Sequence, residues 1–252
     1  MIDLSERVAL VTGGGRGIGR ATAQALSRVG ADVAVTYASD PDAASECVEE
    51  LGRGDARAVA VHLDQGDASS VREGVAEAVA RLGGVDILVN NAGIWNEASA
   101  ELADLDDAAL DRMIDVNLKG AVRVTREVIR GMKDRRYGRV VSVGSTAGVR
   151  GEGGHSHYAA AKGALLAWSR SLTAELGPFG ITANVVSPGW VLTDMTRATL
   201  EALSLADVEA GIPTRRISRP HDVAAAVVFL ASDGAAQISG VNLDVNGGAV
   251  FS

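Results

Sequence analysis

The chain is poor in cysteine, aromatic residues and positive charge, and each shortage excludes something. Its single cysteine, Cys47, rules out an internal disulfide and favours a reducing compartment, so we expect a cytoplasmic protein. Only 4% of the 252 residues are aromatic while 47% are hydrophobic, so alanine, valine and leucine must fill most of the core. The net charge of −8 argues against a nucleic-acid partner bound through its phosphates.

Long apolar runs and targeting signals are also missing. Residues 1–7 show no apolar stretch behind a basic start, so we expect no signal peptide. The run 223–231 is among the longest apolar stretches and is far shorter than a membrane span. No group of residues has the spacing of metal ligands. The sequence therefore predicts a protein with neither a membrane segment nor a metal.

What the chain does have is a regular alternation of short apolar strands and longer helical patterns. This alternation predicts a parallel sheet of about seven strands, covered by helices on both faces. No linker, repeat or change of composition divides the chain, so we predict one doubly wound α/β domain of the Rossmann type over residues 1–252. Strands are expected at 8–11, 32–36, 58–63, 87–89, 139–143, 182–186 and 242–245, and helices at 42–51, 69–82 (with Ser69 or Ser70 as N-cap), 106–132, 158–176 and 222–230.

The stretch 190–218 interrupts this alternation. It begins after Pro188-Gly189, shows a helical pattern near 200–210 and ends near Pro213 and Pro220. Long insertions after a strand of such a sheet usually lie over the ligand crevice at the carboxyl ends of the strands. We therefore predict a substrate lid, with a passive surface excursion as the alternative.

A glycine cluster follows the first predicted strand and opens the first helix. Gly13, Gly17 and Gly19, preceded by Thr12, place bare backbone at a helix N-terminus, where N–H groups and the helix dipole favour phosphate. The spacing differs from the G-x-G-x-x-G fingerprint but occupies the same turn, so we predict a dinucleotide site that includes Ile18.

The end of the second strand indicates which dinucleotide binds. An acidic residue there would bond the ribose 2′-hydroxyl and repel a 2′-phosphate. The sequence instead has Tyr37, Ala38 and Ser39, with no acid before Asp40, while Arg16 in the glycine loop can pair with a phosphate. We predict NADP(H) in preference to NAD(H), and Asp40 is the residue that would upset this assignment if it points inward.

Tyr158 and Lys162 stand four residues apart in an alanine-rich helical pattern, so they share one helix face. A neighbouring ammonium favours the phenolate and is expected to lower the pKa of Tyr158 toward neutral pH. The pair is a candidate proton donor with its activator, although such a pair alone usually decorates a solvated surface.

Several motifs occur in an order that resembles one family. They are Thr12-Gly13-x-x-x-Gly17-x-Gly19, Asn90-Asn91-Ala92-Gly93, Val143-Gly144-Ser145, Tyr158-x-x-x-Lys162, Asn184-Val185-Val186-Ser187-Pro188-Gly189, Phe229-Leu230-Ala231-Ser232-Asp233 and Val245-Asn246-Gly247-Gly248. Together they resemble the short-chain dehydrogenase/reductase family over essentially the whole chain, most of all its β-ketoacyl-(acyl-carrier-protein) reductases. The resemblance implies an oxidoreductase that assembles as a homotetramer.

The resemblance also implies a role for each matching residue. Tyr158 would give a proton to the substrate carbonyl oxygen, Ser145 would polarise that oxygen, and Lys162 would bind the nicotinamide ribose. Asn117 would hold a water that feeds a proton relay. Further cofactor contacts are implied for Asp64 (adenine), Asn90 and Gly93 (crevice wall), Thr193 (carboxamide), and Pro188 and Gly189.

The chain departs from the carrier-dependent relatives at positions that concern the substrate. Arg136 stands where one of two basic carrier-docking residues is expected near the cleft, but Phe179 replaces the other, so an acyl carrier protein is a doubtful partner. Trp95 and Trp190 are expected in the pocket wall, which would suit apolar or aromatic ketones or alcohols. His155 and His157 are expected on the surface or in the pocket lining.

We therefore expect an NADPH-dependent carbonyl reductase, reversible as an alcohol dehydrogenase, with Tyr158 as proton donor. One alternative is a β-ketoacyl-thioester reductase of fatty-acid or polyketide type. An alternative of another class is a catalytically silent protein that senses NADP.

Overall fold

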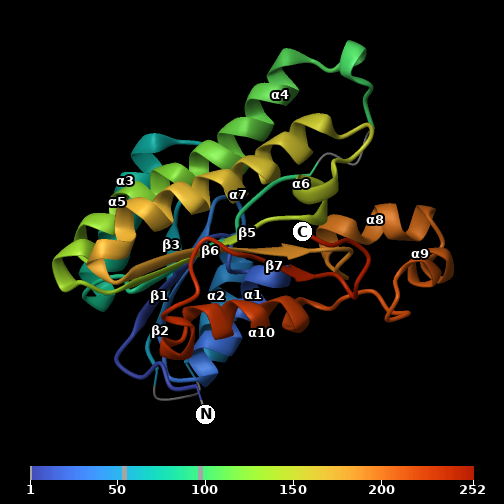
Figure 1. Cartoon of the computed structure of the whole chain (residues 1–252). Coiled ribbons are helices and arrows are strands. Elements are labelled where there is room, and N and C mark those ends of the chain that lie inside the picture. The colour runs from blue at the N-terminus through green and yellow to red at the C-terminus, as the bar shows by residue number, and fades with distance from the viewer. Residues whose placement is uncertain (1, 53–55, 96–98) are drawn as a thin grey trace.

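Seven short strands, built largely of small and branched apolar residues, pair in parallel in the computed structural model, which describes residues 2–52, 56–95 and 99–252 (Figure 1). Their order is β3-β2-β1-β4-β5-β6-β7, so the chain winds outward in one direction from β1 and in the other from β4. The strands are β1 (Val8–Val11), β2 (Asp32–Tyr37), β3 (Ala58–His62), β4 (Ile87–Asn90), β5 (Gly138–Val143), β6 (Ile181–Pro188) and β7 (Asn242–Val245). The predicted doubly wound α/β fold is confirmed.

Helices cover both faces of the sheet because each face carries its own apolar cluster. On one face lie α1 (Gly17–Arg28), α2 (Pro41–Leu51) and α10 (Pro220–Ala231); on the other lie α3 (Ala68–Leu82), α5 (Ala121–Arg135) and α7 (Ser156–Leu176) (Figure 1). The short helix α6 (Thr146–Arg150) follows β5, and α4 (Asp107–Ile114) lies against α7. Within the described part of the chain, no helix is long and apolar enough to cross a membrane.

The long helical stretch expected near 106–132 is confirmed, since the chain is helical from Asp107 to Arg135. The sequence did not predict the π-helical turn at Asp115–Gly120, which lies between α4 and α5. The turn brings Gly120 so close to Gln65 that an added Cβ would lie 2.7 Å from that side chain. It also holds Asn117 inside the protein, with 2% of its surface exposed. Such widened turns often occur at functional sites, and a six-residue change of pitch leaves no clear periodicity in a sequence.

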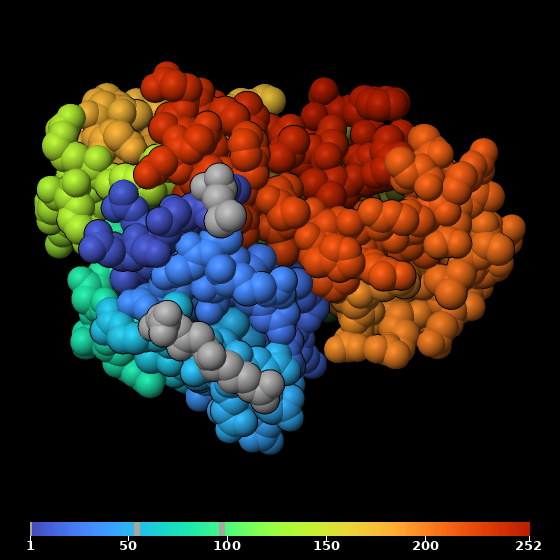
Figure 2. Space-filling model, turned by 90° about the horizontal axis from the view of Figure 1, so that it is seen from below, coloured from blue at the N-terminus to red at the C-terminus, as the bar shows by residue number. Residues whose placement is uncertain are grey.

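Two local expectations need correction. The N-cap of α3 is Asp67, whose Oδ1 accepts hydrogen bonds from the N–H groups of Ser69 (2.7 Å) and Ser70 (3.4 Å), so neither serine is the cap. The stretch 190–218 contains two helices, α8 (Asp194–Ala202) and α9 (Leu205–Gly211), where one was expected. In the space-filling view from below, residues of this stretch form an orange lobe at one side of the molecule (Figure 2).

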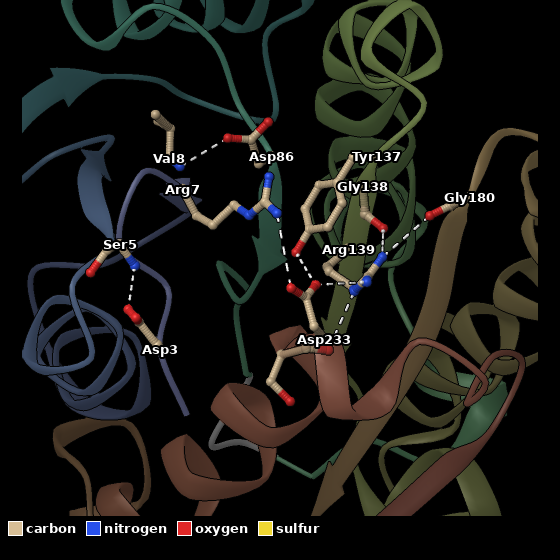
Figure 3. Close-up of polar contacts among 11 residues, drawn as sticks. Asp3, Ser5, Arg7, Val8, Asp86, Tyr137, Gly138, Arg139, Gly180 and Asp233 are labelled. Atoms are coloured by element: carbon tan, nitrogen blue, oxygen red, sulfur yellow. Dashed lines mark hydrogen bonds and ion pairs between the residues drawn. The ribbon is translucent and has the colours of Figure 1, made fainter. Parts of the chain in front are cut away.

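At the amino ends of the strands, a polar cluster joins the N-terminal segment, β5 and the end of α10 (Figure 3). The guanidinium carbons of Arg7 and Arg139 lie 3.8 and 4.4 Å from the ring centroid of Tyr137. Asp233 accepts hydrogen bonds from the Tyr137 hydroxyl (3.0 Å) and from Arg139 Nη2 (3.2 Å). Because Arg139 is only 3% exposed, Asp233 supplies the charge that neutralises a buried guanidinium.

Candidate active site

A cleft of about 730 Å³ lies at the carboxyl ends of the strands, beside the point between β1 and β4 where the winding direction reverses. Ligands of open α/β sheets bind at such switch points. Most of the residues predicted for the site line this cleft: Gly13, Arg16, Gly17, Ile18, Tyr37, Ala38, Ser39, Asp64, Gly93, Trp95, Asn117, Ser145, Tyr158, Lys162, Pro188, Gly189 and Thr193. Gly19, Asn90, His155 and Trp190 are not among the lining residues.

The glycine turn has the geometry of a phosphate cradle. Gly13 and Gly17 have φ values of 61° and 52°, which favour glycine. Gly19 does not line the cleft. An added Cβ at Gly19 would collide with the Gly13 carbonyl, so the missing side chain allows α1 to pack closely on the turn. The first turn of α1 carries no acidic residue, and its N-cap Arg16 makes no side-chain capping bond. The N–H groups there fit the pyrophosphate of a dinucleotide.

Asn91, which sequence reasoning overlooked as a site residue, fixes this turn against the end of β4. Its Nδ2 donates to the carbonyl oxygens of Thr12 (2.9 Å) and Gly13 (3.1 Å). Thr12 Oγ1 in turn accepts from the N–H groups of Asn91 and Ala92, both at 3.0 Å. Asn90, expected at the crevice wall, is instead buried under the sheet, where its Nδ2 donates to Thr125 Oγ1 at 3.0 Å.

Asn117 and Lys162 meet beside Gly93. The Asn117 side chain pairs with the backbone of Ile94, accepting from its N–H at 2.9 Å and donating to its carbonyl at 3.0 Å. Lys162 is 5% exposed and its Nζ donates to the carbonyl of Val143 at 2.9 Å. A Cβ added to Gly93 would lie 2.5 Å from Asn117 Oδ1 and 3.4 Å from Lys162 Nζ. Only glycine therefore allows this arrangement without displacement.

The electrostatic expectation for Tyr158 was wrong. Burial raises the pKa of Tyr158 to about 12, only partly offset by a hydrogen bond with the side chain of Ser145. Lys162 lies 5.9 Å from the Tyr158 ring centroid, and burial lowers the pKa of Lys162 to about 8. The loss of water around each group is the largest cause of its pKa shift. Tyr158 is thus a protonated phenol at neutral pH, beside an ammonium that titrates near the physiological range.

Ser145 joins the end of β5 to this pair. As N-cap of α6 it accepts a hydrogen bond from the N–H of Ala147 at 3.1 Å, which fixes the hydroxyl at the cleft. A carbonyl oxygen placed between Ser145 and Tyr158 could therefore receive two hydroxyl hydrogen bonds.

Aromatic rings border the tyrosine on one side. The Trp95 ring lies 4.7 Å from that of Tyr158, at 86°, and 4.1 Å from that of His155, at 44°. His155 thus backs Trp95 and does not line the cleft, and burial lowers its pKa. His157 is 3% exposed, and neither ring nitrogen has a hydrogen-bond partner within the described residues.

Trp190 is not the pocket wall that we expected. It packs with Leu200, Ile212 and Ile217 in a small apolar cluster of the 190–218 segment. The start of α8 nevertheless reaches across the cleft, because a Cβ on Gly17 would lie 3.3 Å from Thr193 Cγ2. This contact brings Thr193 to the glycine turn.

Arg136 and Phe179, at the two positions where carrier-docking residues were expected near the cleft, do not lie near this chain's own cleft. Arg136 immediately precedes Tyr137 at the amino end of β5, and Phe179 lies just before β6. The cleft opens at the carboxyl ends, so both residues are at the opposite edge of the sheet from this chain's own cleft. Arg136 Nη2 donates to the carbonyl of Pro178 at 2.9 Å.

The cleft also includes residues that sequence reasoning did not assign. Gln65 could have been expected from its place just beyond a strand, whereas Arg112 and Val116 reach the cleft only through the packing of α4 and the π-helical turn. The others are Gly15, Thr36, Asp40, Ala43, Leu63, Asn91, Ala92, Ile94, Val143, Gly144, Val191 and 194–196.

Comparisons with known proteins agree with this geometry. The family model described as "Enoyl-(Acyl carrier protein) reductase" matches residues 13–250. The chain is 42% identical over 249 residues to the 3-oxoacyl-[acyl-carrier-protein] reductase FabG of Escherichia coli K12, covering 98% of each chain. It is 40% identical to the acetoacetyl-CoA reductase of Shinella zoogloeoides, covering 97% of this chain and 99% of the relative. A blue fluorescent protein from a metagenomic library, crystallised in complex with NADPH, superposes with a TM-score of 0.92 at 37% identity, covering 99% of this chain and 100% of that chain.

Proposed function

Because the chain belongs to the short-chain dehydrogenase/reductase family, it is an oxidoreductase, and we propose that it reduces a ketone to an alcohol with NADPH. The observation that carries the proposal is the convergence of Asn117, Ser145, Tyr158 and Lys162 in one cleft beside the glycine turn. A protein that only senses a nucleotide has no need of a buried proton donor.

The cofactor assignment rests on the cradle and on the relatives. The cofactor of this chain is NADP(H), in keeping with the similar protein solved with NADPH. The glycine turn would hold the pyrophosphate, Asp64 the adenine, Arg16 the 2′-phosphate, Lys162 the nicotinamide ribose and Thr193 the carboxamide. When bound, the dinucleotide supplies a hydride to the carbonyl carbon.

The protein's own residues then complete the reduction. Ser145 donates a hydrogen bond to the substrate carbonyl oxygen and stabilises the negative charge that develops there. Tyr158 donates its proton to the same oxygen, so that C=O becomes CH–OH. A pKa of about 12 keeps the phenol protonated before the reaction, so the proton to be donated is in place at neutral pH. Asn117, fixed by Ile94, holds a water that returns a proton toward Lys162 and Tyr158.

The substrate is a 3-oxoacyl thioester or an apolar or aromatic ketone. Two relatives of about 40% identity are named for reductases of 3-oxoacyl-carrier and acetoacetyl-CoA substrates, which favours the thioester. The Trp95 ring beside Tyr158 favours a flat, apolar group next to the carbonyl. The segment 190–218 is the proposed lid, and a homotetramer is the proposed assembly.

Replacement of Tyr158 by phenylalanine tests the reaction, because it removes only the hydroxyl. We expect turnover of acetoacetyl-CoA or of an aryl ketone to be abolished, while the dissociation constant of NADPH stays within a few-fold of wild type. Residual activity of Tyr158→Phe within tenfold of wild type would exclude Tyr158 as proton donor. Comparing the two substrates on the wild-type enzyme decides between the substrate classes.

A further inference from the structure

The residue that the cofactor prediction left open, Asp40, lies at the cleft and pairs with the residue expected to bind the 2′-phosphate. Asp40 Oδ2 is 3.6 Å from Arg16 Nη1, and both residues line the cleft. The other oxygen, Oδ1, accepts a hydrogen bond from the N–H of Ala43 at 3.0 Å and so caps α2. The Asp40 carboxylate therefore pairs with the Arg16 guanidinium and caps the N-terminus of α2 at the same time.

The Arg16 guanidinium and the N-terminus of α2 together form the kind of site that binds a phosphate. α2 is 11 residues long, so its N-terminus carries a full helix dipole, and the glycine loop packs directly on it. A Cβ added to Gly15 would lie 3.0 Å from the N atom of Ala44. Arg16 projects from the same loop, and Tyr37, Ala38 and Ser39 lead into α2 along the cleft. A guanidinium facing a helix N-terminus favours an anion, and Asp40 already supplies one.

We infer that Asp40 is a built-in competitor for the 2′-phosphate and sets how strongly the protein distinguishes NADPH from NADH. The inference rests on the proposed use of NADP(H). For the 2′-phosphate to pair with Arg16, the ion pair between Arg16 and Asp40 must break. The Asp40 carboxylate then also repels the phosphate, because both are anions. NADH, which has a hydroxyl at this position, leaves the ion pair intact. Asp40 thus weakens the binding of one cofactor and not of the other.

The size of this effect is limited by water. The Arg16 side chain is 61% exposed and that of Asp40 is 39% exposed, so solvent screens both the ion pair and the repulsion. Exposed pairs of charges contribute little, and the phosphate carries more than one charge, so we expect the competition to weaken NADPH binding roughly three- to tenfold.

Asp40→Asn is the decisive variant, because asparagine caps a helix as well as aspartate while removing the charge. Dissociation constants for NADPH and NADH are measured by fluorescence titration of the free enzyme at two salt concentrations. Asp42→Asn is the matched control, since Asp42 is an exposed carboxylate in the first turn of the same helix and does not line the cleft. Arg16→Ala, alone and combined with Asp40→Asn, completes a double-mutant cycle.

We expect Asp40→Asn to tighten NADPH binding roughly three- to tenfold at low salt and less at high salt. The dissociation constant of NADH should stay within about twofold of wild type. In the Arg16→Ala background, Asp40→Asn should have no effect on NADPH binding. An unchanged or weakened affinity for NADPH in Asp40→Asn overturns the inference. An equal gain for both cofactors, or the same gain in Asp42→Asn, also overturns it, because the charge would then act without regard to the 2′-phosphate. If the wild type binds neither cofactor, the proposed function itself fails.

Discussion

Replacement of Gly93 by alanine tests how the site is assembled. The added Cβ would lie 2.5 Å from Asn117 Oδ1, which no carbon tolerates, so the Asn117 side chain must leave its place. It would then lose the two hydrogen bonds with Ile94, at 2.9 and 3.0 Å. Each is worth about 0.5–1.5 kcal/mol, so the loss is about 1–3 kcal/mol. If that positioning serves the transition state, kcat falls about 5- to 150-fold.

The assay is NADPH-dependent reduction of acetoacetyl-CoA, with kcat and the dissociation constant of NADPH determined separately. Gly177→Ala is the control, because an added Cβ there meets no atom within 4 Å. We expect Gly177→Ala to behave as wild type. A folded Gly93→Ala enzyme whose kcat stays within twofold of wild type would refute the reasoning that Asn117 must be held at this position.

Two further predictions concern stability. Burial lowers the pKa of Lys162 from 10.5, its value in the unfolded chain, to about 8 in the folded protein. Between pH 8 and 10.5 the unfolded chain therefore binds more protons than the folded protein, and the free energy of unfolding rises with pH. The free energy of unfolding of the wild type, measured with denaturant and without cofactor, should therefore rise by up to about 3 kcal/mol relative to that of Lys162→Met between pH 7 and 10. A difference between the two proteins that does not change with pH would contradict the buried ammonium. Asp233→Ala should destabilise the protein by about 1–3 kcal/mol, because the buried Arg139 loses its countercharge but keeps backbone carbonyl partners. This loss of stability is smaller than for a fully buried pair because the Asp233 side chain is 66% exposed. Asp134 is also exposed, so Asp134→Ala is the control. An equal loss of thermal stability in Asp134→Ala would disprove that Asp233 neutralises Arg139.

The elements of this fold could be predicted from the sequence because their causes are local. Short apolar runs such as 8–11 and 87–89 can be satisfied only in a buried parallel sheet, and the intervening helical patterns must cover it. Gly13 and Gly17 predicted a tight turn after the first strand, and both have positive φ values there, which favour glycine. The four-residue spacing of Tyr158 and Lys162 on one helix placed both at the cleft.

The roles of individual polar residues could not be predicted in the same way. Asn90 and Asn91 are neighbours with the same chemistry, yet Asn90, the last residue of β4, is buried, and Asn91, just beyond the strand, bonds to the glycine loop. Trp190 follows a conspicuous Pro-Gly pair but packs against residues of its own segment, 190–218. Asn117 reaches the cleft only because the helix widens by a π-helical turn, which packs on Gln65 from a distant strand end.

By itself the sequence determined the order of strands and helices, the glycine turn and the pairing of Tyr158 with Lys162, since these depend on residues close together in the chain. Tertiary structure alone decided the protonation of Tyr158, whose pKa rises because surrounding segments remove its water. It also decided that Arg16 pairs with Asp40 in the lining of the cleft. Burial and charge pairing arise from contacts between residues far apart in sequence, and no local pattern encodes them.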